Sequence, residues 1–476
     1  MELTNFTIKQ LHQGLRSKEF SVTEVTEAYL AQIDEKDKAL EAYLSVDREG
    51  ALSAAREVDE KITRNEAISV LAGIPLAIKD NILIEGQSAT AGSKILKDYI
   101  AAYDATVIEK LKKENAVFLG KTNLDEFAMG SSTENSGYKI TKNPHDLSRV
   151  PGGSSGGSAV AVVAGMAAGA LGSDTGGSIR QPAAFSGVVG LKPTYGAVSR
   201  YGLIALASSL DQIGPLTKTV EDAAILFRAI AGHDKNDSTS ISGISYEGML
   251  SPDLEDLKKL TIGIPEEYFV EGLDNEVAES IEEVKKSLEA AGFKFKKINL
   301  PHTKYALSVY YIILPAEAST NLARYEGIRY GTRGETKNLI ELYYENRGQG
   351  FGPEVKRRII LGTFVLSAGY YDAYYSKAQR VRTLVKQDFE EAFKSVDVIL
   401  APTAPTPAFK IGEKTKNPLE MYLSDAFTLP VNLAGLPGIS IPVKGRGGKL
   451  PIGFQLIAKP FREADILGIG RVYEGV

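Results

Sequence analysis

Two clusters of glycine and serine enclose one short apolar run, and this arrangement constrains the fold more than any other feature of the sequence. The clusters are Pro151-Gly-Gly-Ser-Ser-Gly-Gly-Ser158 and Gly172-Ser-Asp-Thr-Gly-Gly-Ser-Ile-Arg180. Nine of the residues from 152 to 177 are glycine, against 46 in all 476 residues, so the enrichment is local. Dense glycine marks backbone that adopts positive φ or approaches another group closely. Residues 159–171 are long enough for a buried helix and too short for a membrane span, so we predict loop, buried helix and loop.

This layout brings hydroxyl side chains close to main-chain N–H groups that have no bulky neighbours. The hydroxyls belong to Ser154, Ser155, Ser158, Thr175 and Ser178. A row of free N–H donors binds an anion or a developing oxyanion. A flexible linker would not enclose an apolar helix. The sequence has neither G-x-x-x-x-G-K-[ST] nor G-x-G-x-x-G, so a nucleotide-binding loop is also disfavoured.

Composition excludes several classes of site. The chain has no cysteine, which excludes disulfides, thiolate nucleophiles and cysteine-bound metals. Its four histidines are scattered without metal-ligand spacing, so we expect no metal site. With a net charge of −5, the chain as a whole lacks the excess of basic residues that binds nucleic acid. No secretory signal is visible at the N-terminus, and we expect a cytoplasmic protein without membrane contact.

Strands and helices alternate along the chain, which predicts α/β layering. The capping box Ser21-Val-Thr-Glu24 predicts the start of a surface helix. An apolar run over residues 71–78 predicts a buried strand. Helical sequence fills about residues 305–393 as a peripheral portion, and the late strands, within residues 396–458, are expected to rejoin the first sheet. We predict a single domain over residues 1–476.

A serine hydroxyl becomes a nucleophile only when a base takes its proton. The histidine nearest the glycine clusters is His145, in the turn-like segment Asn143-Pro-His-Asp146, and no G-x-S-x-G elbow is present. Lys79 follows the predicted strand directly. To act as a base it needs a pKa about 3 units below ~10.4, roughly 4 kcal/mol, which desolvation among neutral hydroxyls can supply. From the residues alone, a surface lysine paired with Asp80 or another carboxylate is at least equally open.

The motifs that carry these residues resemble those of the amidase signature family. They are Gly73-Ile-Pro-Leu-Ala-Ile-Lys-Asp80, the two clusters with the second extended to Pro182, Gly190-Leu-Lys-Pro-Thr-Tyr-Gly196 and Ser209-Leu-Asp-Gln-Ile-Gly-Pro215. The resemblance implies the family's α/β fold, one mixed central β-sheet covered by helices on both faces, with a signature core at about residues 71–216. It weakens after about Phe461, where the family continues further, and an incomplete or divergent C-terminus is expected.

The resemblance also implies a role for each residue. Ser178 would be the nucleophile. Ser154, on a cis peptide bond, would pass the proton of Ser178 to the base Lys79. The oxyanion would be bound by the N–H groups of Thr175, Gly176, Gly177 and Ser178. This agrees with the argument from glycine, because only backbone without bulky side chains can crowd a tetrahedral centre.

A narrower similarity, within residues 310–325, 421–425 and 432–438, is to the glutamine-hydrolysing subunits of tRNA-dependent amidotransferases. It implies that ammonia from glutamine amidates Glu-tRNA(Gln), Asp-tRNA(Asn) or both. Asp425 would bind the α-ammonium of glutamine and Arg358 its α-carboxylate, with Tyr310 in the same pocket; the neighbouring Arg357 makes the arginine ambiguous. Partner subunits B and C would complete a heterotrimer. ATP, Mg²⁺ and the charged tRNA would be held by the partner, and this chain would need no cofactor.

Two alternatives stay open at this point. A stand-alone amidase for small or aryl amides would share Lys79, Ser154 and Ser178 and differ in the pocket. A non-catalytic scaffold would keep the fold and hold a partner. The choice between the two tRNAs would be made by the partner subunits, which read the tRNA.

Overall fold

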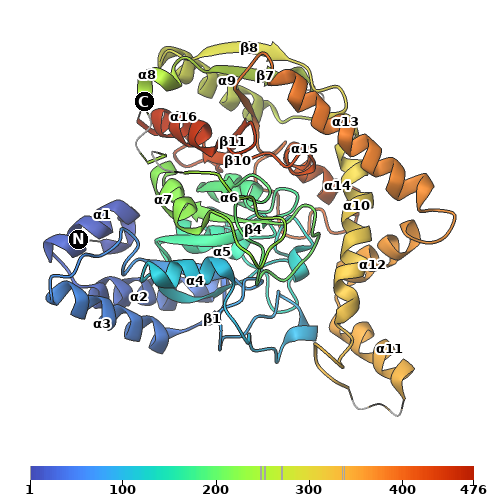
Figure 1. Ribbon diagram of the computed structural model, residues 1–476, viewed down its shortest axis with the longest axis horizontal. Coiled ribbons are helices and arrows are strands. Elements are labelled where there is room, and N and C mark those ends of the chain that lie inside the picture. The colour runs from blue at the N-terminus through green and yellow to red at the C-terminus, as the bar shows by residue number, and fades with distance from the viewer. Residues whose placement is uncertain are drawn as a thin grey trace.

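Eleven strands of the described chain form one sheet (Figure 1). The computed structural model describes residues 2–246, 249–250, 253–269, 272–334, 336 and 338–475. The strands are β1 (Tyr43–Val46), β2 (Pro75–Lys79), β3 (Val117–Thr122), β4 (Gly169–Asp174), β5 (Val189–Lys192), β6 (Gln212–Thr217), β7 (Thr261–Pro265), β8 (Lys294–Ile298), β9 (Val398–Pro402), β10 (Gly438–Pro442) and β11 (Gly453–Ala458). Their order across the sheet is β1-β3-β2-β4-β6-β5-β10-β11-β9-β7-β8.

The sheet is mixed, as predicted. β2 runs parallel to β3 and β4, and β7 runs parallel to β8 and β9. The other pairs in the sheet are antiparallel. The late strand β10 pairs with β5, with Ile439 opposite Leu191, so the late strands lie in the same sheet as the glycine-rich region.

Helices surround this sheet. Those of the described residues are α1 (Ile8–Ser17), α2 (Val22–Leu40), α3 (Arg48–Thr63), α4 (Thr106–Lys113), α5 (Gly156–Val163), α6 (Arg180–Ser186), α7 (Val220–Ile230), α8 (Leu254–Leu257), α9 (Asn275–Ala290), α10 (Ala306–Asn321), α11 (Leu339–Gly350), α12 (Pro353–Val365), α13 (Lys377–Ala392), α14 (Pro418–Tyr422), α15 (Leu429–Leu433) and α16 (Glu463–Gly475). The predicted capping box opens α2: the Glu24 N–H donates to Ser21 Oγ, and the Ser21 N–H donates to the Glu24 carboxylate. Within the described chain, no helix combines the length and the apolarity that a bilayer crossing requires.

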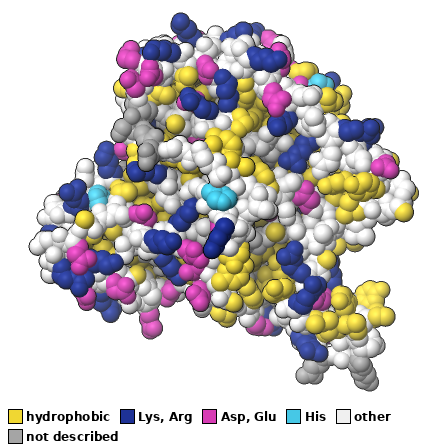
Figure 2. Space-filling model, viewed as in Figure 1, with side chains coloured by type: hydrophobic (Ala, Val, Ile, Leu, Met, Phe, Trp, Pro, Cys, Tyr) yellow, Lys and Arg dark blue, Asp and Glu magenta, His cyan; other side chains and the backbone are white. Residues whose placement is uncertain are grey.

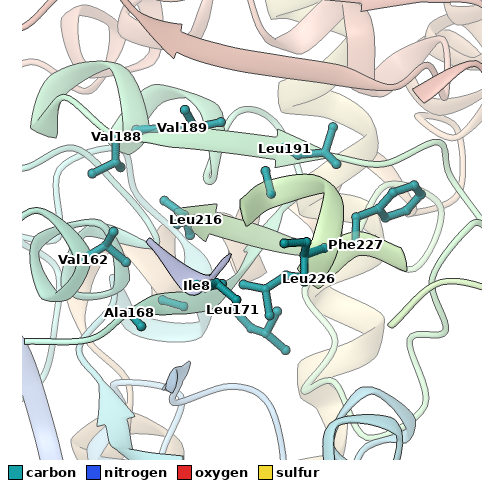
Figure 3. Close-up of a cluster of buried hydrophobic side chains, with 14 of the residues drawn as sticks. Ile8, Val162, Ala168, Leu171, Val188, Val189, Leu191, Leu216, Leu226 and Phe227 are labelled. Atoms are coloured by element: carbon teal, nitrogen blue, oxygen red, sulfur yellow. The ribbon is translucent and has the colours of Figure 1, made fainter. Parts of the chain in front are cut away.

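Alternating side chains show that helices cover both faces of the sheet, which confirms the predicted fold class. In β9, Val398 and Leu400 join the apolar cluster that contains α7, α9 and α16. Ile399 and Ala401, which point the other way, join the cluster that contains α10, α13 and α15. On the first face, Ile8 of α1 and Leu226 of α7 pack around Leu171 of β4 (Figure 3). The backbone there is close-packed, because a Cβ at Gly169 would lie 2.8 Å from Leu226 Cδ1.

The structure corrects the prediction of a buried helix over residues 159–171. Helix α5 ends at Val163, and the second half of the run is strand β4, which begins at Gly169. Gly165, with φ 71°, lies in the turn between them. A short run of small apolar residues suits a buried helix and a buried strand equally, and here pairing with β2 and β6 selects the strand. The second cluster therefore starts in a strand, and its loop begins at Thr175.

Candidate active site

Two parallel neighbouring strands bring Lys79 to the glycine-serine loops. Lys79 is the last residue of β2, Asp174 is the last of β4, and Ile78 lies opposite Leu171, so both strands end at the same edge of the sheet. The Lys79 Nζ lies 2.8 Å from Ser154 Oγ, 2.8 Å from Ser155 Oγ and 2.9 Å from Ser173 Oγ. The lysine is fully buried. The alternative of a surface lysine paired with Asp80 is wrong, because Asp80 pairs with the buried Lys121 at 3.4 Å.

The surroundings of Lys79 favour its neutral form. Burial lowers the pKa of the ammonium to about 7, against the attraction of the Asp125, Asp174 and Asp211 carboxylates, which raise it. At pH 7 such a group has roughly a thousandfold more neutral amine than a free lysine with a pKa of about 10.4. A neutral amine among hydroxyls can accept a proton from one of them.

The loop before α5 carries Ser154, and the peptide bond from Gly153 to Ser154 is cis. The Ser155 N–H donates to the Ser178 carbonyl (3.1 Å), which ties this loop to the second one. Among the described residues, the Ser178 hydroxyl makes no hydrogen bond, and it is 8% exposed whereas Ser154 is fully buried. The structure therefore places Ser154 against the base and Ser178 where a substrate can reach it.

Most of the predicted oxyanion donors are free. Within the described chain, the N–H groups of Thr175, Gly176 and Ser178 have no acceptor. Gly177 differs from the prediction, because its N–H donates to Asp174 Oδ1 at 2.8 Å. Gly176 has no room for a side chain, since a Cβ there would lie 2.5 Å from the Tyr310 hydroxyl. Glycine at 176 thus lets the backbone donors approach the pocket.

Asp174 organises this loop, and sequence reasoning missed it. Its carboxylate accepts from the N–H groups of Gly177 (2.8 Å) and Ile179 (3.2 Å) and from Arg180 Nε (3.1 Å). Burial opposes the charge on Asp174, but the Arg180 guanidinium brings its pKa down to about 2. The acidic and basic residues on either side of the Thr-Gly-Gly-Ser segment were the available signal. Ser155 and Ser173, which hold Lys79, were also missed as partners of the base.

Asp425 lies beside the loop that carries the N–H groups of Thr175, Gly176 and Ser178. It ends the short turn after α14, and three residues later Thr428 Oγ1 donates to the Gly176 carbonyl (2.6 Å). Ser131 Oγ donates to one Asp425 oxygen, while the other oxygen is buried without a partner among the described residues. Burial raises the pKa of Asp425 to about 7; the Ser131 hydrogen bond lowers it and the nearby Asp174 charge raises it further. An unpaired buried carboxylate oxygen calls for a cationic partner.

The structure resolves the ambiguity between the two arginines of α12. The Arg358 side chain is 4% exposed and that of Arg357 is 44% exposed. The charge of Arg358 acts on Asp425 and on Tyr310, whose hydroxyl stands next to Gly176. Tyr310, Arg358 and Asp425 thus lie within electrostatic range of one another and bring both signs of charge beside Gly176.

His145 is not part of this pocket chemistry. Its Nε2 lies 3.0 Å from the Ser186 carbonyl, and the Asp146 N–H closes the predicted turn onto the Asn143 carbonyl. The described residues contain no group of three or more His, Asp or Glu side chains arranged to hold a metal ion. The candidate reactive groups that the structure brings together are thus the lysine, the serines of the first loop and the backbone donors of the second.

Comparison with known proteins agrees with this fold. The sequence profile of the Amidase family matches residues 24–467, and the chain belongs to that family. It is 60% identical over 475 residues to the A subunit of the Glutamyl-tRNA(Gln) amidotransferase of Carboxydothermus hydrogenoformans, covering 100% of this chain and 98% of that protein. The corresponding protein of Microcystis aeruginosa, with the same name, is 56% identical, covering 98% of this chain and 97% of the relative.

Solved structures show the same fold. The crystal structure of the A subunit of the Glutamyl-tRNA(Gln) amidotransferase from Thermotoga maritima is 45% identical, with a TM-score of 0.81 over 100% of this chain and 95% of that one. The peptide amidase of Stenotrophomonas maltophilia is 29% identical, with a TM-score of 0.84 over 99% and 96% of the two chains. Proteins with different names thus share this fold, and the fold alone does not define the substrate.

Proposed function

We propose that the chain is the glutamine-hydrolysing subunit of a tRNA-dependent amidotransferase, a carbon–nitrogen ligase that uses glutamine as amido donor. The observation that carries the proposal is that Arg358 and Asp425, two buried residues of opposite charge, lie beside the glycine-serine loops that Lys79 contacts. The names of the relatives described above support it. The ammonia would convert Glu-tRNA(Gln), Asp-tRNA(Asn) or both to the amidated form.

The reaction starts with the transfer of one proton through two hydroxyls. Neutral Lys79 takes the proton of Ser154, and Ser154 takes that of Ser178 as the Ser178 hydroxyl turns toward it on substrate binding. The Ser178 oxygen then forms a bond to the side-chain amide carbon of glutamine. The negative charge moves onto the amide oxygen, where the free N–H groups of the second loop stabilise it.

The tetrahedral intermediate collapses when the proton returns. Lys79 gives it back through Ser154 to the amide nitrogen, and the carbon–nitrogen bond breaks. Ammonia leaves, and a glutamyl ester remains on Ser178. Water then attacks the ester by the same route and releases glutamate, which restores both hydroxyls and the neutral lysine. No cofactor takes part in these steps.

Recognition of glutamine requires an anion for its α-ammonium and a cation for its α-carboxylate. The unpartnered Asp425 oxygen suits the first role, and the buried Arg358 guanidinium suits the second. Because burial raises the pKa of Asp425 to about 7, an ammonium group bound beside it would hold the carboxylate in its charged form.

The proposal includes partners. Subunits B and C would complete a heterotrimer in the cytoplasm, with ATP, Mg²⁺ and the charged tRNA on the partner, in keeping with the net charge of −5 on this chain. Helix α11 exposes Leu339, Ile340 and Tyr344 by 57%, 68% and 77%, and Figure 2 shows hydrophobic side chains gathered in this region. Exposed apolar patches of this kind mark contacts between proteins, which supports a chain that works in a complex.

Two glutamine analogues test the pocket. Glutaramate keeps the α-carboxylate without the amino group, and 4-aminobutanamide keeps the amino group without the carboxylate. We expect Arg358→Ala to raise the KM of the assembled complex for glutamine and glutaramate by roughly 10- to 100-fold, and to leave 4-aminobutanamide unchanged. Asp425→Asn should give the opposite pattern, because it removes the ammonium partner.

The measurement is steady-state ammonia release for each variant with each amide. A stand-alone amidase for small or aryl amides would show little preference for glutamine, and neither substitution would separate the two analogues. That result would reject the proposed substrate. A scaffold without activity would release no ammonia from any of the three amides.

A further inference from the structure

A buried glutamate stands one helical turn before the carboxylate-binding candidate. Glu354, on α12, has a side chain that is 10% exposed. One of its oxygens accepts from Arg358 Nε (2.8 Å) and from the Tyr422 hydroxyl (2.8 Å), and the other accepts from Arg357. Burial opposes the charge on Glu354, but Arg358, Tyr422 and Arg357 hold its pKa below the usual value. The glutamate is therefore charged at neutral pH and accepts hydrogen bonds from three donors.

Two stacked tyrosine rings lie beside the same guanidinium. Tyr311 and Tyr422 stack with centroids 3.8 Å apart and an interplanar angle of 19°. The Arg358 Cζ lies 5.3 Å from the Tyr311 centroid and 5.5 Å from the Tyr422 centroid, within cation–π range. Arg358 is thus held at its Nε by Glu354 and lies beside the two rings.

The way Arg358 is held decides which part of it stays available. Within the described residues its two terminal nitrogens make no hydrogen bond, while its Nε is taken by Glu354. The terminal nitrogens form one edge of the guanidinium that can bind a carboxylate through two parallel hydrogen bonds. Two arginines share one glutamate, so a net positive charge remains at this edge.

Tyr422 also connects the two charged anchors of the pocket. It lies three residues before Asp425 on the segment formed by α14 and the turn Leu423–Asp425. Its hydrogen bond to Glu354 ties that segment to α12, which carries Arg358. One contact thus joins the helix of the positive anchor to the segment of the negative anchor. A zwitterion with fixed spacing between its charges requires such a constraint.

We propose that Glu354 and Tyr422 are positioning residues that make the pocket selective for amides with an α-carboxylate and an α-ammonium. Glu354 aims the free edge of Arg358, and Tyr422 sets the spacing between Arg358 and Asp425. This inference rests on the proposed function, and it adds two residues that touch no reacting atom.

The test uses the assembled complex and the three amides glutamine, glutaramate and 4-aminobutanamide. Glu354→Gln keeps the size of the side chain and removes its charge. We expect it to raise KM about tenfold for glutamine and glutaramate, with kcat within about twofold and 4-aminobutanamide unchanged. Tyr422→Phe keeps the ring and loses the hydroxyl. It should raise KM for glutamine by roughly 2- to 10-fold, and more than for either singly charged analogue, because only glutamine needs both anchors at once.

Glu420→Gln, an exposed substitution on the same segment, is the control and should match the wild type for all three amides. If Glu354→Gln lost activity equally on all three amides and had a lower melting temperature, Glu354 would have a purely structural role and the inference would be overturned. If the wild-type complex prefers glutamine and both variants keep its KM values, the inference would be overturned and the proposed function would stand. A wild-type complex that does not distinguish glutamine from 4-aminobutanamide would reject the proposed function as well.

Discussion

Replacing Ser178 by alanine is expected to lower ammonia release from glutamine by roughly 10⁴- to 10⁶-fold, because no other atom is placed to form the ester. The fold should be unaffected. The Ser178 hydroxyl makes no hydrogen bond within the described residues, so its removal leaves no buried partner unsatisfied. Steady-state ammonia release and the melting temperature of the assembled complex measure the two effects.

Ser158→Ala supplies the matched control from the first cluster. Ser158 is buried and bonds to Thr122 Oγ1 (2.7 Å) and to the Leu171 carbonyl (3.1 Å), away from Lys79. We expect it to keep activity within about tenfold, with a small loss of stability from the broken hydrogen bonds. If Ser178→Ala kept a rate comparable to that of Ser158→Ala, another nucleophile would have to be sought.

Replacing Lys79 by methionine should lower kcat by at least 10²- to 10⁴-fold, the usual contribution of a general base. The wild-type profile should also carry the signature of this lysine. Only the neutral amine accepts a proton, so with a pKa of about 7 the value of kcat should rise with pH, be half-maximal near pH 7 and level off at higher pH. The profile is measured at saturating glutamine, where the bound ammonium keeps Asp425 ionised and its titration does not contribute.

A second buried lysine distinguishes titration of the base from titration elsewhere. Lys192, on β5, is also fully buried, and burial together with Arg180 lowers its pKa to about 7. Its Nζ donates to the Pro193 carbonyl (2.7 Å). The Lys192→Met variant should therefore keep the inflection near pH 7. If this variant lost the inflection and Lys79→Met kept full activity, the assignment of Lys79 as the base would be wrong.

The reactive centre could be anticipated from the sequence where local chemistry dictates it. Glycine at 176 was predicted from the need for bare backbone donors, and the close approach of Tyr310 shows why a side chain does not fit there. The position of Lys79 after an apolar run left both a half-buried base and a surface lysine open, and the structure shows that the side chain is fully buried. These features depend on short stretches of chain, so a pattern in the sequence can reveal them.

Features that arise from tertiary contacts could not be anticipated in this way. The run over residues 159–171 has no periodicity that separates a helix from a strand, and the pairing of β4 with its neighbours decided it. Adjacent arginines on a helix point about 100° apart, and only the packing of α12 against α10 and α14 shows that Arg358 is the buried one. Glu354 gave no signal, because its partner Tyr422 is 68 residues away in the chain.

The most direct test of the central claim is the intact mass of the chain after incubation of the assembled complex with glutamine and a rapid acid quench. The covalent mechanism predicts an added mass of one glutamyl group, located on Ser178 by peptide mapping and missing from the Ser178→Ala variant. An adduct on another residue, or one that persists in that variant, would contradict the mechanism.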